Sequence, residues 1–306
     1  MRAVLLLPAP DPTMARAATL PKTAPVSAGA HTASLDAATF RELAVLVDES
    51  CGIVMSDAKR VMLETRLRRR LVARGLEDFR AYLALLRSPE GRAAELQAFT
   101  DCVVTNETSF FREPPHFEYL TPDELRRLAE GGRERSLRIW SAASSSGQEA
   151  YSLAMIADDA SNGGQLFPWT VTATDISVRM LNAVREGVYH ADAVRNVPAR
   201  LRQKYLTPVG TAADQAMSVR PELRRNVRLG QINLMHGEYR PGQTMDVVFC
   251  RNVLIYFQPD AQLEVVGKLL RHLRVGGLLF LGHAESIRST RLPLRLIRSN
   301  IYERTE

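Results

Sequence analysis

Two acidic side chains stand at the ends of apolar, β-rich runs, where a parallel sheet would hold a ligand. Glu149 follows the run 137–141 and a stretch of small residues, SAASSSGQ, that permits a tight turn and close approach of the backbone to a ligand. Asp175 ends the next run, 170–174, where an acidic residue is placed to accept hydrogen bonds from two ribose hydroxyls. The pair therefore predicts a site for a nucleoside cofactor.

The motifs that are missing narrow the kind of nucleoside. The sequence contains no GxGxxG and no GxxxxGK[ST], so it lacks the phosphate cradles of dinucleotide sites and P-loops. A nucleoside whose tail carries an ammonium, facing Glu149, fits better, and S-adenosylmethionine (SAM) has that tail. The alternative is that Glu149 and Asp175 each cap the helix that follows. For either residue alone that alternative is favoured, but the pair at consecutive strand ends weakens it.

The elements that would position these residues alternate between strand and helix after Pro114. This alternation is typical of a mainly parallel sheet covered by helices on both faces, so the expected fold is α/β and Rossmann-like. We expect a small antiparallel β-hairpin insertion at about residues 200–230. The other expected strands are 137–141, 170–174, 245–250, 277–282, 295–298 and 300–304, and the expected helices are 147–158, 177–186 and 259–273.

The first third of the chain has a different texture. Residues 1–33 are rich in Ala, Pro and Thr and have no helical or strand period, so we expect a disordered tail, in which Met14 is an alternative start. Helical periods follow, with Ser34 as an expected N-cap, a helix over 56–74 that ends at Gly75, and two more helices up to residue 105. We therefore predict a small all-helical domain over 34–113, followed by the α/β domain over 114–306.

Composition fits a soluble globular protein of about two domains, since 45% of the 306 residues are hydrophobic and 24% are charged. No run approaches the roughly 18 apolar residues that a membrane span needs, so we expect no membrane insertion and a cytoplasmic location. Cys51, Cys102 and Cys250 are far apart and lack any CxxC spacing. They indicate reduced thiols, and we expect no metal site.

One segment accounts for the formal net charge of +6, because residues 58–75 hold seven basic side chains against one acidic one. On a helix, three leucines of this segment form an apolar stripe, and several basic residues share another face. Most runs of this kind are solvated basic helices with no specific partner. The more specific interpretation is a docking surface for an anionic partner. No aromatic residue interleaves the arginines, so we expect no nucleic-acid partner. The residues of the basic face are Lys59, Arg66 and Arg70, with Arg69 at its margin.

Five motifs, in order, identify the family that this chain resembles. They are TNETSFFRE (105–113), WSAASSSGQEAYS (140–152), ATDI (173–176), FCRNVLIYF (249–257) and GHAE (282–285). Together they look like the motifs of the CheR family, the SAM-dependent methyltransferases that esterify glutamates on bacterial chemoreceptors. The resemblance covers about residues 35–304 and implies this activity, a helical domain before the methyltransferase domain, and chemoreceptors as partners. We expect the protein to be a monomer.

The resemblance also implies roles for single residues. The glutamate at 149 would bind the ammonium of SAM, and the aspartate at 175 would bind the ribose. The residues that would close over the methionine part are Asn106, Thr108 and Arg112. Those that would line the adenine and carboxylate region are Asn233, Leu234, Cys250 and Arg251. Those expected near the substrate carboxylate are Arg112, Arg251 and Tyr256.

Two departures from the family pattern limit what it implies. Relatives read Gly-Glu-Glu where this chain has Gly147-Gln148-Glu149, which leaves any role of the first acid in doubt. Some relatives grip a C-terminal receptor peptide through a glycine-rich turn in the β-hairpin, whereas the turn here, 208–215, offers only Gly210. We therefore expect docking without that peptide. His283 and Glu285 are expected to stabilise their loop and not to catalyse.

Three functions remain open at this point. The first is methyl transfer to receptor glutamates, with the basic face binding the acidic receptor helix. The second is a signalling module that binds SAM and no longer methylates, for which Gln148 is the sole support. The third is an RNA methyltransferase, which is supported only by the basic helix.

Overall fold

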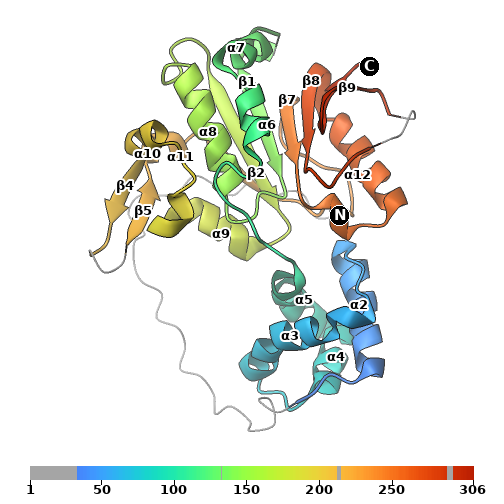
Figure 1. Cartoon of the computed structure of the whole chain (residues 1–306). Helices are drawn as coiled ribbons and strands as arrows, with labels where there is room; N and C mark the ends of the chain where they lie inside the picture. The colour runs from blue at the N-terminus through green and yellow to red at the C-terminus, as the bar shows by residue number, and fades with distance from the viewer. Residues whose placement is uncertain (1–32, 132, 212–214, 288–291) are drawn as a thin grey trace. The chain divides into compact units, whose positions relative to one another are not determined.

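The computed structural model describes residues 33–131, 133–211, 215–287 and 292–306 (Figure 1). The predicted disordered tail, 1–33, lies outside these residues except for its last one. Contacts divide the chain into two compact units, one that ends at Thr105 and one that begins at Asn106. The domain boundary predicted from the sequence lies later, after residue 113. Residues 106–113 go with the second unit because they pack there: the Phe111 amide donates to Ser152 Oγ, and Phe110 lies in that unit's core.

The first unit is all-helical, as predicted. Asp36, and not Ser34, caps the first helix, because its carboxylate accepts hydrogen bonds from the amides of Ala38 and Thr39. Gly75, at φ 65°, ends α3 in the left-handed conformation that glycine adopts most easily. The helices of this unit are α2 (Ala37–Cys51), η1 (Asp57–Lys59), α3 (Arg60–Arg74), α4 (Phe79–Arg87) and α5 (Pro89–Val103). The predicted apolar stripe of α3 is fully buried and comprises Leu63, Leu67 and Leu71.

A seven-stranded sheet forms the centre of the second unit, in the order β6-β2-β1-β7-β8-β10-β9. The five strands from β6 to β8 are parallel, and β10 and β9 close the edge in antiparallel register. The parallel strands are β1 (Leu137–Ala142), β2 (Trp169–Asp175), β6 (Val227–Gln231), β7 (Met245–Cys250) and β8 (Leu273–Leu281). The antiparallel pair is β9 (Leu294–Arg298) and β10 (Ile301–Arg304).

Alternate residues of each strand face opposite sides of the sheet and build two cores. In β1, Leu137 and Ile139 belong to the core under α7 and α8, whereas Trp140 and Ala142 belong to the core under α12. Both faces are therefore covered by helices (Figure 1), as the continuous apolar runs of the central strands predict. The larger helices of this unit are α7 (Pro122–Gly131), α8 (Gln148–Ala160), α9 (Val178–Glu186) and α12 (Pro259–Leu270).

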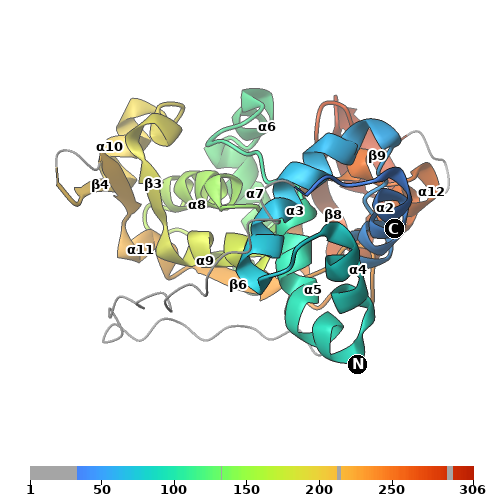
Figure 2. The same ribbon diagram turned by 90° about the horizontal axis from the view of Figure 1, so that it is seen from below.

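The predicted antiparallel insertion is present and larger than a hairpin. Its three strands pair in the order β3-β5-β4, and the first of them begins at Val188, well before residue 200. Together with α10 and α11 this small sheet lies beside α8 and α9 (Figure 1 and Figure 2). The turn discussed above lies partly outside the described residues. The elements are β3 (Val188–His190), α10 (Ala199–Tyr205), β4 (Leu206–Val209), β5 (Ala216–Val219) and α11 (Pro221–Arg224).

Among the described residues, no helix has both the length and the apolar character that crossing a membrane requires.

Candidate functional site

The predicted site residues of the second unit gather where the strand order reverses. From β1 the chain proceeds to β2 on one side, while β7 pairs with β1 on the other, so the carboxyl ends of β1 and β7 flank the switch point. Ligands of open parallel sheets bind in the crevice at such a point. Glu149 follows β1, and Arg251 follows β7 directly.

The loop after β1 is tightly wound and tied to the end of β2. Ala143, Ser145 and Gly147 all have positive φ, at 65°, 50° and 96°. A Cβ on Gly147 would lie 2.9 Å from Val184 Cγ2, so only glycine fits there without displacing α9. Asp175 secures the turn, because its carboxylate accepts hydrogen bonds from the amides of Ser145 and Ser177 at 2.8 Å each.

These two bonds give Asp175 a structural role. Its side chain is buried, and each oxygen already accepts one backbone amide. The N-cap of α9 is Ser177, whose Oγ accepts the Met180 amide, so Asp175 binds the residue that caps the helix and does not cap it itself. A carboxylate oxygen can accept more than one hydrogen bond.

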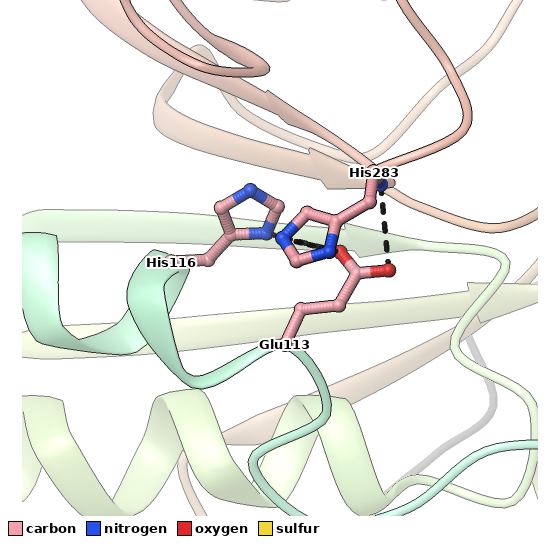
Figure 3. Close-up of side chains that lie close together, drawn as sticks. All are labelled: Glu113, His116 and His283. Atoms are coloured by element: carbon pink, nitrogen blue, oxygen red, sulfur yellow. Dashed lines mark hydrogen bonds and ion pairs between the residues drawn. The ribbon is translucent and has the colours of Figure 1, made fainter.

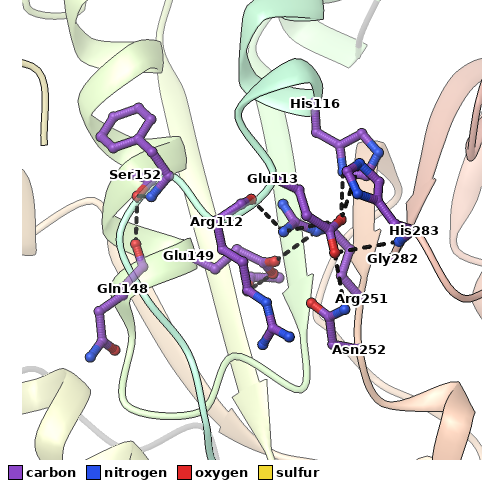
Figure 4. A network of polar contacts seen from close by, with 12 residues as sticks. Arg112, Glu113, His116, Gln148, Glu149, Ser152, Arg251, Asn252, Gly282 and His283 are labelled. Atoms are coloured by element: carbon purple, nitrogen blue, oxygen red, sulfur yellow. Dashed lines mark hydrogen bonds and ion pairs between the residues drawn. The ribbon is translucent and has the colours of Figure 1, made fainter. Parts of the chain in front are cut away.

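Arg251 is the centre of the site, with its side chain only 1% exposed (Figure 4). Its Nη2 donates to the Arg112 carbonyl and lies 3.5 Å from Glu113 Oε2, while its Nε lies 3.6 Å from Glu149 Oε2. The guanidinium carbon is 5.5 Å from the ring centre of Phe117. Nε and Nη1 are buried and have no hydrogen-bond partner among the described residues. A buried guanidinium with unused donors is suited to receive another carboxylate.

Glu149 lies in the first turn of α8 but does not cap it. Its Oε1 accepts a 2.7 Å hydrogen bond from Ser141 Oγ, and its other oxygen faces Arg251. Burial raises the pKa of the Glu149 carboxyl, against the opposing effects of Arg251 and Ser141. A cationic ligand group beside it would stabilise the ionised form. For Glu149, the capping alternative is wrong.

Gln148 takes no part in this network. Its amide oxygen accepts a hydrogen bond from Ser146 Oγ at 2.9 Å, and Figure 4 shows the amide pointing away from Arg251. The departure from the family pattern at this position therefore leaves the contacts of Glu149 and Arg251 intact.

Glu113 was assigned no role by the sequence analysis, yet it lies opposite Glu149 across Arg251. Its Oε1 accepts from Asn252 Nδ2 at 3.1 Å and from the His283 amide at 3.4 Å. Burial acts to raise the pKa of Glu113, but the Asn252 amide and Arg251 outweigh it, so the pKa is lowered and the group is ionised. Its backbone is left-handed, at φ 60°, as is that of Asn252, at φ 57°. Such strained non-glycine residues cluster at functional sites.

Glu285 stabilises its loop, as expected. Its carboxylate accepts the amides of Asn252 and Gly282, both at 2.7 Å, and that of Ile255 at 3.3 Å. These bonds hold the segment after β7 against the end of β8, and thereby fix the backbone next to Arg251.

The remaining predicted residues lie around this centre with fewer polar contacts. The Asn106 carbonyl accepts from Ser145 Oγ at 2.9 Å, and Arg112 Nη1 donates to the Glu107 carbonyl at 2.9 Å, while Thr108 is partly buried. Leu234 and Cys250 have buried side chains in the core under α12, which leaves their backbone as the part able to line a ligand. Asn233 Oδ1 accepts the Met235 amide, and Tyr256 packs against the same core.

The basic face of α3 is largely occupied within its own unit. Arg70 donates twice to Glu95, at 2.6 and 2.8 Å, and Arg74 also binds this fully buried carboxylate. Arg66 donates to the carbonyls of Val103 and Val104 and to Thr105 Oγ1 at the end of α5. Arg69 is exposed, and its Nε contacts Cys102 Sγ at 3.2 Å. Much of the local +6 thus holds the helical unit together.

The geometry can be compared with known proteins. The model of the CheR methyltransferase all-alpha domain matches residues 38–104, and that of the CheR methyltransferase SAM-binding domain matches residues 106–302. This chain belongs to the CheR methyltransferase family. It is 38% identical to the chemotaxis protein methyltransferase of Escherichia coli K12, over 83% of this chain and 86% of that protein. It is 37% identical to the protein of the same name from Salmonella typhimurium LT2, over 83% and 85%.

Among solved structures, this chain is similar to a glycopeptide N-methyltransferase, MtfA, complexed with sinefungin. That similarity covers 64% of this chain and 60% of the other at 14% identity, with a TM-score of 0.33.

The family match makes the protein a SAM-dependent methyltransferase, and the donor set of the site fits SAM. A methionine tail carries one ammonium and one carboxylate. Glu149 offers a buried carboxylate for the former. Asp175 presents a carboxylate at the end of β2.

Proposed function

We propose that this CheR-family protein transfers the methyl group of SAM to glutamate side chains of bacterial chemoreceptors and forms methyl esters. The observation that carries this proposal is Arg251, which is buried between Glu113 and Glu149 with two donor nitrogens unused. A substrate carboxylate matches the positive charge of this buried guanidinium. The names of the relatives in Escherichia coli and Salmonella support chemotaxis as the setting.

The chemistry asks little of the protein in acid–base terms. Bound SAM supplies a methyl group that its sulfonium already activates. A glutamate with a pKa of roughly 4.3 is already ionised at neutral pH, so no general base is required. The contribution of this chain is then orientation and exclusion of water. Arg251 orients the incoming carboxylate, and its two ion pairs keep the guanidinium from binding that carboxylate too tightly. We place Arg112 and Tyr256 beside it.

The cofactor roles follow the same contacts. We propose that Glu149 binds the ammonium, Asp175 the ribose, and the backbone of Asn233, Leu234 and Cys250 the adenine. Asn106 and Thr108 would close over the methionine part.

Docking of the acidic receptor helix remains assigned to the basic face of the helical unit, with a narrower set of residues. Arg70 and Arg66 serve mainly within the unit, which leaves Arg69 as the exposed arginine of the face, beside Lys59. We expect Arg69→Glu to lower the affinity for the receptor and to make that affinity less dependent on salt concentration, because exposed charges act chiefly on the association rate. Arg92→Glu, an exposed charge on α5, is the matched control. Equal effects of both variants would contradict a docking role for α3.

The structure gives the competing functions little support. Gln148 was the sole basis for a module without methyl transfer, and its side chain lies apart from the network around Arg251. Two of the arginines that suggested RNA binding are engaged within the unit, Arg70 by Glu95 and Arg66 by backbone carbonyls.

The test is methyl transfer from labelled SAM to a receptor cytoplasmic fragment by wild type, Arg251→Lys and Asp175→Ala. Lysine keeps the charge but loses the fork of donors, so we expect about a hundredfold loss of kcat/KM for Arg251→Lys. Asp175→Ala should mainly weaken SAM binding. The exposed Arg271→Lys is the control. Full activity of Arg251→Lys would refute the role given to Arg251.

A further inference from the structure

Three potential metal ligands converge at the edge of the site, beyond the residues assigned to SAM or substrate. Glu113 precedes α6 (Pro114–Tyr119), His116 lies on α6, and His283 follows β8 (Figure 3). Glu113 Oε2 is 3.4 Å from His116 Nδ1 and 3.9 Å from His283 Nε2, and the ligand atoms all lie within 4.8 Å of one another. Segments about 170 residues apart thus bring two imidazoles and a carboxylate together.

The buried members of this cluster are incompletely satisfied. His116 is only 1% exposed, and neither ring nitrogen has a hydrogen-bond partner among the described residues. The same holds for Glu113 Oε2. A buried polar group without a hydrogen-bond partner destabilises the fold, so a ligand that engaged these atoms would be stabilised by them.

We propose that Glu113, His116 and His283 form a binding site for a divalent metal ion of the zinc class. Two imidazoles and one carboxylate are a common zinc ligand set with a fourth position open. Tetrahedral bonds of about 2.0–2.1 Å place ligand atoms about 3.3 Å apart. The Glu113–His116 separation already matches. His283 has to move closer, and its side chain is 55% exposed.

The position of Arg251 gives the metal a consequence. Arg251 Nη2 lies 3.5 Å from Glu113 Oε2, the oxygen that would bind the ion. A dication bound to this oxygen would repel the neighbouring guanidinium. Binding of the ion to Glu113 therefore competes with the Arg251–Glu113 ion pair. If the proposed role of Arg251 in methyl transfer is correct, zinc therefore inhibits the enzyme by displacing Arg251.

The binding test is calorimetric titration of Zn²⁺ into the chelator-treated, tag-free full chain, without SAM or receptor. We expect saturable binding at a single site, weakened at least about tenfold in His283→Ala and in Glu113→Gln. His190→Ala, which removes an exposed imidazole elsewhere, should bind like wild type. His283 is largely exposed, so its removal leaves the fold intact. Wild-type affinity in His283→Ala, or no binding below about 1 mM, would overturn the site.

The inhibition test is kept separate from the binding test. Methyl transfer is measured with added Zn²⁺, and we expect activity to fall with the midpoint of the calorimetric titration in wild type and at higher zinc in His283→Ala. Undiminished activity at saturating zinc would overturn the competition with Arg251. Zinc binding in a protein that methylates no receptor would refute the proposed function and leave the metal site standing.

Discussion

The Glu95→Gln variant probes how the charge surplus of α3 is used. Glu95 is fully buried and accepts four hydrogen bonds, two from Arg70, one from Arg74 and one from the Tyr82 hydroxyl at 2.9 Å. Burial acts to raise the pKa of Glu95, but these donors outweigh it, so the pKa is lowered and the group is a carboxylate in the fold. The amide of glutamine has only one acceptor oxygen, and its NH₂ group would face the N–H donors of Arg70 or Arg74.

The size of the effect follows from this count. Removing one partner of a buried ion pair costs about 3–5 kcal/mol. The side chains of Arg70 and Arg74 are 22% and 35% exposed, so both can turn partly to water. The cost therefore lies at the lower end of that range. We therefore expect the free energy of unfolding of the helical unit to fall by about 3 kcal/mol, which corresponds to a loss of amide protection of about two orders of magnitude.

Hydrogen exchange followed by mass spectrometry on the full chain is the assay. Peptides from α3 and α5 should lose protection in Glu95→Gln, whereas peptides from the parallel sheet keep it. Glu90→Gln, an exposed acid on the same helix, is the matched control and should change nothing. A loss below about threefold, or a loss spread evenly into the sheet, would refute the reasoning that Glu95 organises the basic helix.

Three further predictions concern other parts of the chain. The Gln148→Glu variant restores the acid of the family pattern. Its SAM affinity, measured by calorimetry, should stay within about threefold of wild type, because the side chain lies apart from Arg251. A change of about tenfold would contradict this. Hydrogen bonds from the backbone and side chain of Thr39 lower the pKa of Asp36 from 3.8 to about 2, so its stabilising effect is complete above about pH 4 and disappears as the pH falls towards 2. Thermal melts of Asp36→Ala should fall below those of wild type at pH 7 and converge with them in acid, and a constant difference would speak against this. Burial raises the pKa of the Cys51 thiol from 9.0 to about 11. Iodoacetamide at pH 8 should therefore modify this thiol about a hundredfold more slowly in the folded than in the unfolded chain. Equal rates in the two states would contradict this prediction.

The elements that hold the site were predictable because their signals are local. Continuous apolar runs indicated the four central strands 137–141, 170–174, 245–250 and 277–282, and their order placed Glu149 and Asp175 at neighbouring strand ends. The residues of strand β6 (Val227–Gln231) give no clear strand signal of their own, since its short sequence mixes Arg, Gly and Gln with two apolar residues. Helix α6 begins with two prolines and spans six residues, too few for a helical period to show.

The contacts that define the site were not predictable in this way. Helical spacing places Arg66 and Arg70 on one face of α3 but does not say that Glu95, on another helix, meets that face. Glu113 and Arg251 are likewise brought together only by the fold. The FFRE motif does contain Glu113, and an acid immediately after a predicted site arginine was the one signal that could have drawn attention to it.

The central claim is that this chain forms methyl esters on receptor glutamates. The most direct measurement is incubation of the full-length protein with labelled SAM and a receptor cytoplasmic fragment, followed by mapping of the label by mass spectrometry. We expect label on glutamate side chains, released as methanol by mild alkali, at a rate that falls about a hundredfold when Arg251→Lys replaces the wild type. Alkali-stable label, or SAM binding without any transfer to the receptor, would contradict it.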